Sequence, residues 1–142
     1  MPEVASVGSV MSMDDAATMA MALPDVIEGV RHGHRSWSVK GKGFAWERPF
    51  HKADIKRFGD EPVPAGPILA VHTVDLSDKE AVLAEAAKGV FTITHFNNYP
   101  AVLIQLDVAS KRVVRELIVD GWLACAPRQM ADEYVARSRS RR

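Results

Sequence analysis

Basic side chains gather in one part of this sequence and form its clearest chemical feature. Residues 31–57 carry eight Lys and Arg side chains against two carboxylates, a local charge of +6. Trp37, Phe44 and Trp46 lie among them. Lys and Arg neutralise phosphates, and aromatic rings stack on bases, so this pattern favours contact with a DNA backbone. The residues that we assign to this contact are Arg31, Arg35, Lys40, Lys42 and Arg48.

A second interpretation of the same stretch places the aromatic residues in the core of a sheet, with the bases at its rim. Strand alternation does not decide between the two, because a hairpin has two faces. The chain has 18 basic and 18 acidic residues, so a cationic face would belong to one segment of a neutral protein.

The segment His95–Pro100 is an alternative candidate site. Its two asparagines and its proline favour a turn, and functional side chains concentrate in turns. We expect this turn to meet the turn at Gly33-His34 at one end of the sheet and to enclose a small anionic molecule. The ligand-binding residues would then be His34, His95, Asn97, Asn98 and Tyr99. His95 could act as a general base, although a bond to a local carbonyl is the simpler explanation of a histidine in a turn.

Other kinds of chemistry find little support. His32 and His34 would share one face of a strand, but the flanking Arg31 and Arg35 oppose a cation, so we expect no metal. The single cysteine, Cys125, excludes a disulfide framework. There is no phosphate-binding glycine loop and no GxSxG nucleophile motif. We therefore expect no cofactor and no catalytic residues, and we favour a binding module over an enzyme.

Length and composition indicate the class of protein to which these candidate sites belong. The chain has 142 residues, of which 47% are hydrophobic and 25% charged, as in a soluble globular domain. This length predicts one domain. The sequence has no apolar run long enough to span a bilayer, and residues 1–30 contain no Lys or Arg to start a secretory signal. We expect a cytoplasmic monomer without membrane contact.

Turn and capping residues divide the chain into short elements. Ser12 can cap a helix over 13–22, and the glycines within 40–43 suit a hairpin between strands in 26–48. The four prolines of 49–67 predict an extended connection. The remaining expected elements are a strand at 68–74, a helix from a capping box at Ser77 to Lys88, strands at 90–94 and 101–106, a helix at 108–122, and a helix from Pro127 to Arg137.

This order of elements, with short connections between the strands, predicts an antiparallel α+β domain. We place the domain at residues 12–136, between a flexible leader at 1–11 and a basic disordered tail at 137–142.

Several short motifs, taken in order, resemble the MmcQ/YjbR-like family. The resemblance covers about residues 13–136, and each motif alone is short. The motifs are Met21-Ala22-Leu23-Pro24, Glu28-Gly29, Gly33-His34, Trp37-x-Val39, Gly41-Lys42-Gly43-Phe44-Ala45, Lys79-Glu80-Ala81-Val82-Leu83, Phe91-x-Ile93 through Leu103, Asp120-Gly121-Trp122 and Ala126-Pro127.

The resemblance implies a small CyaY-like (frataxin-like) fold, also described as a double wing, and a family commonly labelled DNA-binding. It implies no catalytic residues. Gly121 stands where the family more often has alanine, and residues 49–67 form a longer connection than in the shortest members. Iron binding does not follow from the fold, because fold does not determine function.

Overall fold

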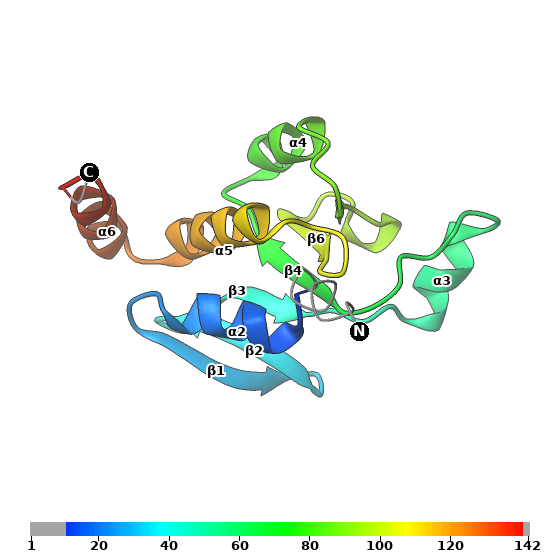
Figure 1. Ribbon diagram of the computed structural model, residues 1–142, viewed down its shortest axis with the longest axis horizontal. Helices are drawn as coiled ribbons and strands as arrows, with labels where there is room; N and C mark the ends of the chain where they lie inside the picture. Colours follow the sequence, from blue (N-terminus) through cyan, green and yellow to red (C-terminus); the bar gives the residue numbers. More distant parts are fainter. Residues whose placement is uncertain (1–10, 141–142) are drawn as a thin grey trace, which may run out of the picture.

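A single antiparallel sheet organises the molecule. The computed structural model describes residues 11–140, and the strands run in the order β1-β2-β3-β4-β6-β5 (Figure 1). The strands are β1 (Val26–Arg31), β2 (His34–Val39), β3 (Lys42–Glu47), β4 (Ile68–His72), β5 (Val90–Phe91) and β6 (Ala101–Gln105). All neighbouring strands pair antiparallel, so the predicted α+β class is confirmed.

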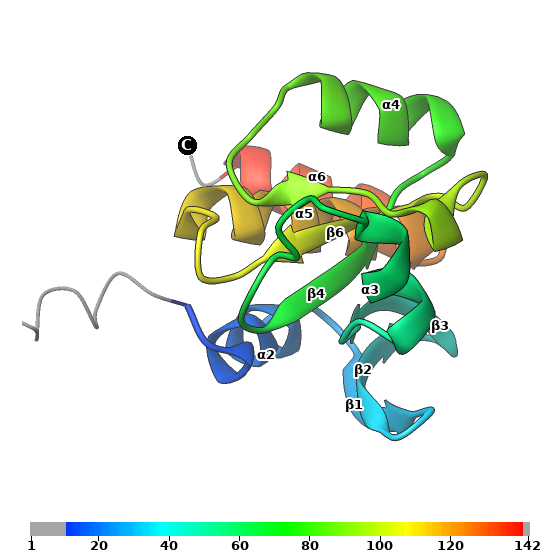
Figure 2. The same cartoon turned by 90° about the vertical axis from the view of Figure 1, so that its right-hand side faces the viewer.

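Helices cover the sheet on both sides (Figure 2). The helical elements are α2 (Met13–Met21), α3 (Lys52–Phe58), α4 (Leu76–Ala84), the 3-10 turn η1 (Thr94–Phe96), α5 (Lys111–Cys125) and α6 (Arg128–Ser140). We call the side covered by α2 and α5 the first face of the sheet. The side covered by α3 and η1 is the second face.

The first face holds the larger hydrophobic core, which includes Trp37, Phe44 and Trp122 without exposed surface. One stripe of α5 is apolar, and it packs against β3 and β4. Gly121 lets this helix approach closely, since a Cβ there would lie 2.7 Å from Val71 Cγ1. The indole N–H of Trp122 donates to the Pro24 carbonyl at 3.0 Å and so ties α5 to the end of α2.

Two tight turns join β1, β2 and β3. His32 and Gly33 have φ values of 53° and 81°, and Lys40 and Gly41 have 48° and 83°. Two consecutive residues with positive φ are typical of a type I′ turn, whose twist matches the twist of the paired strands. The hairpin expected at residues 40–43 is confirmed, with its reversal at Lys40-Gly41.

The expectation of an extended connection over residues 49–67 is wrong, because α3 occupies its middle. The prolines of this segment lie outside Lys52–Phe58, so none interrupts the helix. The carboxylate of Asp54 accepts the His51 N–H at 2.9 Å and caps the first turn. A left-handed glycine, Gly59, ends it.

Other boundaries shift for local reasons. The cap of α4 is Asp75, whose carboxylate accepts the Asp78 N–H at 2.7 Å, and not Ser77. This helix ends at Ala84, short of the expected Lys88. α5 spans Lys111–Cys125, three residues later than expected, and its cap is Ser110.

Both expected flexible ends differ from the structure where it describes them. Met11, placed in the leader, is buried in the core of the first face. Helix α6 continues to Ser140, so residues 137–140 of the expected tail are helical. The rest of the leader, residues 1–10, and residues 141–142 lie outside the described part of the chain.

Candidate ligand-binding site

The five basic residues assigned to DNA do not share one surface. Lys42 lies directly opposite Val39, which is buried on the first face. Arg31 lies on the second face, where an added Cβ at Gly43 would be 3.6 Å from its Nη1. Lys40 lies in the turn at the other end of the hairpin and pairs with Asp25 at 3.4 Å. These three cations therefore point in different directions.

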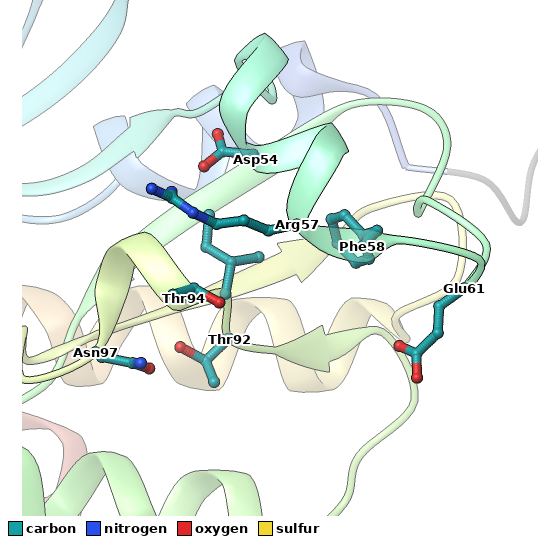
Figure 3. A pocket seen from close by; sticks show the side chains of 8 residues that line it. Asp54, Arg57, Phe58, Glu61, Thr92, Thr94 and Asn97 are labelled. Carbon is teal, nitrogen blue, oxygen red and sulfur yellow. The ribbon is translucent and has the colours of Figure 1, made fainter.

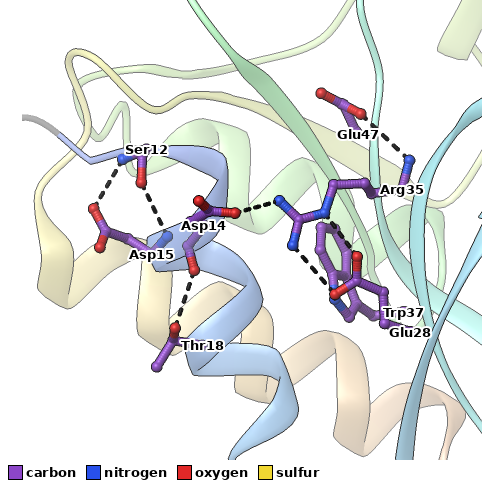
Figure 4. Close-up of polar contacts among 8 residues, drawn as sticks. All are labelled: Ser12, Asp14, Asp15, Thr18, Glu28, Arg35, Trp37 and Glu47. Carbon is purple, nitrogen blue, oxygen red and sulfur yellow. Dashed lines mark hydrogen bonds and ion pairs between the residues drawn. The ribbon is translucent and has the colours of Figure 1, made fainter.

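Arg35 is fully engaged by carboxylates (Figure 4). Its Nε donates to Glu28 at 2.7 Å and its Nη1 donates to Asp14 at 2.6 Å. The hydrogen bond from Arg35 lowers the pKa of Glu28, and burial opposes it only in part. Trp37 Nε1–H donates to the same carboxylate at 3.1 Å, and the Arg35 guanidinium lies 5.4 Å from the Trp37 ring centroid. Arg35 thus clamps α2 onto the β1–β2 hairpin and is not free for phosphate.

Arg48 is buried on the second face, with 7% of its surface exposed. Its Nη1 pairs with Asp54 at 3.0 Å and donates to the Pro49 carbonyl at 2.6 Å. Burial would raise the pKa of Asp54, but the hydrogen bonds from the His51 N–H and from Arg48 outweigh it, so the pKa is lowered. This ion pair fixes α3 to the end of β3, and Arg48 serves structure.

The residues expected to form a ligand site with the 95–100 turn are not all brought together. His34 lies beside Glu47, with 4.0 Å between Nδ1 and Oε1, at the end of the strands where Leu69 pairs with Ile104. The turn enters β6 at the opposite end, where His72 pairs with Ala101. The exposed residues His95, Asn97, Asn98 and Tyr99 stay within one turn. The expected meeting of the two turns is therefore wrong.

A buried lysine holds this turn in place. Lys79 of α4 has 6% of its surface exposed, and its Nζ donates to the carbonyl of Phe96 at 2.6 Å and of Tyr99 at 2.8 Å. Burial lowers the pKa of Lys79. Phe96 in turn stacks on Trp46, with ring centroids 6.4 Å apart, and lies under the Arg48 guanidinium. The turn is thus a rigid wall on the second face.

A pocket of about 290 Å³ opens between this wall and α3 (Figure 3). It is lined by Asp54, Arg57, Phe58, Glu61, Thr92, Ile93, Thr94 and Asn97. The volume is close to the lower limit of roughly 300 Å³ for small-molecule sites. Asn97 is the one residue of the predicted ligand set that lines it.

The charged groups of the pocket differ in availability. The Asp54 side chain is 3% exposed and is already held by Arg48. Arg57 and Glu61 are exposed, and neither forms an ion pair within residues 11–140. Figure 3 shows the guanidinium of Arg57 at one end and the carboxylate of Glu61 at the other, with Phe58 between them. The pocket therefore offers a cation and an anion, separated by an apolar surface.

Thr92 adds a polar group beside these charges. Its hydroxyl is buried and finds no hydrogen-bond partner among residues 11–140. Buried polar groups are nearly always paired in folded proteins, so an unpaired one needs a reason. Because Thr92 also lines the pocket, its hydroxyl is a polar group next to any molecule bound there.

Sequence reasoning missed most of this lining. Arg57, Phe58 and Glu61 fall in the segment expected to be an extended connection, and Thr92 falls inside an expected strand. One partial local signal is Gly59, because glycine is common just after the end of a helix, but no typical cap residue marks the start of α3. The contact between α3 and residues 92–97 depends on tertiary packing and leaves no local signal.

Two other kinds of feature are absent from residues 11–140. No group of three or more His, Cys, Asp or Glu in that range could hold a metal ion. No helix in the same range is long and apolar enough to cross a membrane.

Comparison with known proteins gives relatives but no activity. The uncharacterized proteins Mb2600 of Mycobacterium bovis and MT2646 and Rv2570 of Mycobacterium tuberculosis are each 39% identical to the chain over 128 residues. The alignment covers 88% of this chain and 96% of each relative. No family model matches, and no solved structure matches significantly. At this identity and coverage, the chain belongs to the same family as these three mycobacterial proteins.

Proposed function

We propose that this protein binds a small polar molecule in the pocket between α3 and residues 92–97. The observation that carries the proposal is the placement of two charges, Arg57 and Glu61, at the two ends of that pocket, where neither forms an ion pair with another residue in 11–140. A ligand with a carboxylate or phosphate near Arg57 and an ammonium group near Glu61 would match both.

The rest of the lining suits such a ligand. Thr92, Thr94 and Asn97 provide hydroxyl and amide groups for hydrogen bonds, and Phe58 and Ile93 provide apolar surface. The wall is rigid, because Lys79 and the Arg48–Asp54 pair fix the turn and α3 before any ligand arrives. Pre-organised groups lose less freedom on binding, which favours affinity.

We propose binding without turnover. The pocket lining contains no His, Cys or Lys side chain, and of its two carboxylates Asp54 is already paired with Arg48. His95 belongs to the neighbouring turn and does not line the pocket.

We also keep the MmcQ/YjbR-like assignment, and the DNA contact that goes with it, as proposals. An antiparallel sheet with α2 and α5 packed against one face agrees with the small α+β domain that the resemblance implies. The DNA contact has weaker support, because Arg35 and Arg48 are engaged and the other three assigned cations diverge. Fluorescence anisotropy with a labelled 25-mer duplex across a salt series tests it.

The pocket is tested by chemical-shift perturbation in two-dimensional NMR with a panel of small zwitterions, carboxylates and phosphates. We expect perturbed amides at residues 54–61 and 92–97, and affinity for anions reduced about two- to fivefold by Arg57→Gln. Lys56→Gln is the matched control, since Lys56 is an exposed cation on the same helix that does not line the pocket. A panel that leaves the pocket amides unmoved would refute the proposal, as would equal losses in both variants.

A further inference from the structure

Within residues 11–140, no strand or helix pairs with the outer edge of the sheet at β1. β1 is the first strand in the sheet order and pairs only with β2. Every residue of this strand after Val26 is exposed, with Ile27 at 67% and Val30 at 77%. Figure 1 shows β1 along the border of the molecule, with α2 over one face of the hairpin and no element beside the strand.

The hairpin geometry determines which backbone groups point outward. In a two-residue turn the flanking residues, Arg31 and His34, exchange both hydrogen bonds, and the pattern then alternates along the strands. The β1–β2 register is continuous, so Gly29 and Ile27 also bond to β2. Val26, Glu28 and Val30 therefore direct their N–H and C=O groups away from the sheet.

This edge lacks most of the devices that keep edge strands apart. It has no proline, and the bulge in this part of the sheet lies between β2 and β3. The one acidic side chain, Glu28, is drawn onto the first face by Arg35 and Trp37. An exposed, apolar and regular edge is a template for another strand.

We propose that β1 pairs antiparallel with β1 of a second copy of this chain, across a two-fold axis at Gly29. Symmetry and backbone direction leave few registers, because residues from the set Val26, Glu28 and Val30 must face one another. An axis at Glu28 would set two like charges opposite, which is destabilising. With an axis at Val30, Glu28 would face position 32, which belongs to the turn after Arg31 and is not part of the strand. An axis at Ile27 or at Val26 would set Pro24, which lies outside β1 and has no N–H, opposite an outward-facing residue. The axis at Gly29 avoids all of these.

In this register the facing side chains of the two copies can contact one another favourably. Glu28 of each copy lies opposite Val30 of the other on the first face. The two Val30 side chains become diagonal neighbours, and so do the two Glu28 side chains, each of which is already paired with Arg35 of its own copy. On the second face Ile27 lies opposite Arg31 of the second copy, whose aliphatic stem can cover it. The two Gly29 residues form a non-hydrogen-bonded pair, in which the two backbones lie close together. Glycine has no side chain to obstruct this close contact.

The pairing should be weak. A single strand pair covers less than the roughly 800 Å² per partner of a standard stable interface, so association depends on concentration. Sedimentation equilibrium between micromolar and millimolar protein should show a monomer–dimer exchange in the wild type. Val30→Lys should weaken association at least tenfold. Ile55→Lys, at an exposed apolar residue of α3, is the matched control and should leave it unchanged.

A cross-link tests the register itself. Cα atoms of a non-bonded antiparallel pair lie about 4.5 Å apart, within the range that a disulfide spans. The space around Gly29 is open, since an added Cβ meets no atom within 4 Å, so the Gly29→Cys variant should fold. Mild oxidation should then link two copies through it. Ile27→Cys is the control, because residue 27 of one copy faces residue 31 of the other.

Each outcome decides the proposal. Faster cross-linking of the Gly29→Cys variant than of the Ile27→Cys variant, together with loss of dimer in Val30→Lys, would support it. A wild type that stays monomeric at millimolar concentration would overturn it. A Val30→Lys substitution that leaves the dimer affinity unchanged would overturn it as well. So would equal rates of cross-linking in both cysteine variants.

Discussion

The two faces of the sheet are built on different principles. The first face is sealed by α2 and α5 around apolar side chains such as Trp37, Phe44 and Trp122. The second face has a smaller apolar cluster, and around it lie the buried charged residues of residues 11–140, Arg48, Asp54 and Lys79. The pocket opens on this second face. Apolar burial therefore provides stability on one side, and fixed charges position short segments on the other.

This difference predicts how each face should fail when it is altered. An apolar core suffers when its volume changes, because its packing is dense. A buried ion pair suffers when one partner is removed, because the other charge is left without compensation. The losses of stability caused by substitutions on the two faces should therefore differ in size and in physical cause.

The largest effect should come from Asp54→Ala on the second face. It leaves Arg48 charged and buried, and it also removes the cap of α3, so we expect the free energy of unfolding to fall by about 3–5 kcal/mol. Urea denaturation followed by circular dichroism measures the change.

The matched control is Asp132→Ala. It breaks the Arg128–Asp132 pair of α6, whose side chains are 95% and 75% exposed, and it should cost less than about 0.5 kcal/mol. If the two variants lost similar stability, the buried pair would not be what holds the second face together.

The contrast between the two faces also explains which helices can be predicted from the sequence. α2 is foreseeable because Ser12 and Asp15 form a reciprocal cap within one turn. α3 is not, because its seven residues gain their stability from Arg48 and from packing against η1. For α4, Asp75 and Ser77 both suit a cap, and the structure uses the earlier one.

The second prediction alters the first face at Gly121. Alanine is favoured over glycine in a helix by about 1 kcal/mol. However, its Cβ would lie 2.7 Å from Val71 Cγ1 and 3.1 Å from the Phe44 carbonyl oxygen, and that backbone cannot easily move. Overpacking costs of this kind are about 1–3 kcal/mol, so we expect Gly121→Ala to destabilise by about 1 kcal/mol.

Thermal unfolding of Gly121→Ala and of Gly29→Ala at the same dilute concentration gives the comparison. Gly29 has open space around it, so its substitution should not lower the melting temperature. A Gly121→Ala variant more stable than the wild type would show that α5 can move away from β4 at little cost. The first face would then be less tightly packed than its distances indicate.

The candidate site is harder to predict from sequence than the fold. A cluster of Lys and Arg in residues 31–57 suggests one cationic surface, but strand alternation and two hairpin turns send these side chains in different directions. Glu28 and Asp14, which neutralise Arg35, lie 7 and 21 residues away from it. Charge counted along the chain does not show such pairs. The lining of the pocket likewise comes from segments brought together only by folding.

The smallest effect should come from a surface group near the rim of the first face, Asp120 of α5. Burial and the nearby charges of Asp78, Glu116 and Glu85 raise its pKa above the ordinary 3.8. The folded protein therefore holds a proton that the unfolded chain has lost, over the window from about pH 3.8 up to the raised pKa. Across that window the wild type loses stability as the pH rises.

Asp120→Asn removes this loss, since the amide resembles the protonated acid and does not ionise. We expect equal stability for the variant and the wild type below pH 3.8, and a gain for the variant that grows with pH and levels off above the raised pKa. Because the carboxyl is only partly desolvated and solvent screens its charge, the gain at pH 7 should be a few tenths of a kcal/mol. Urea titrations of both proteins at several pH values measure it. A gain that is already full at pH 3 would mean that Asp120 acts through packing and that its charge does not lower the stability of the first face.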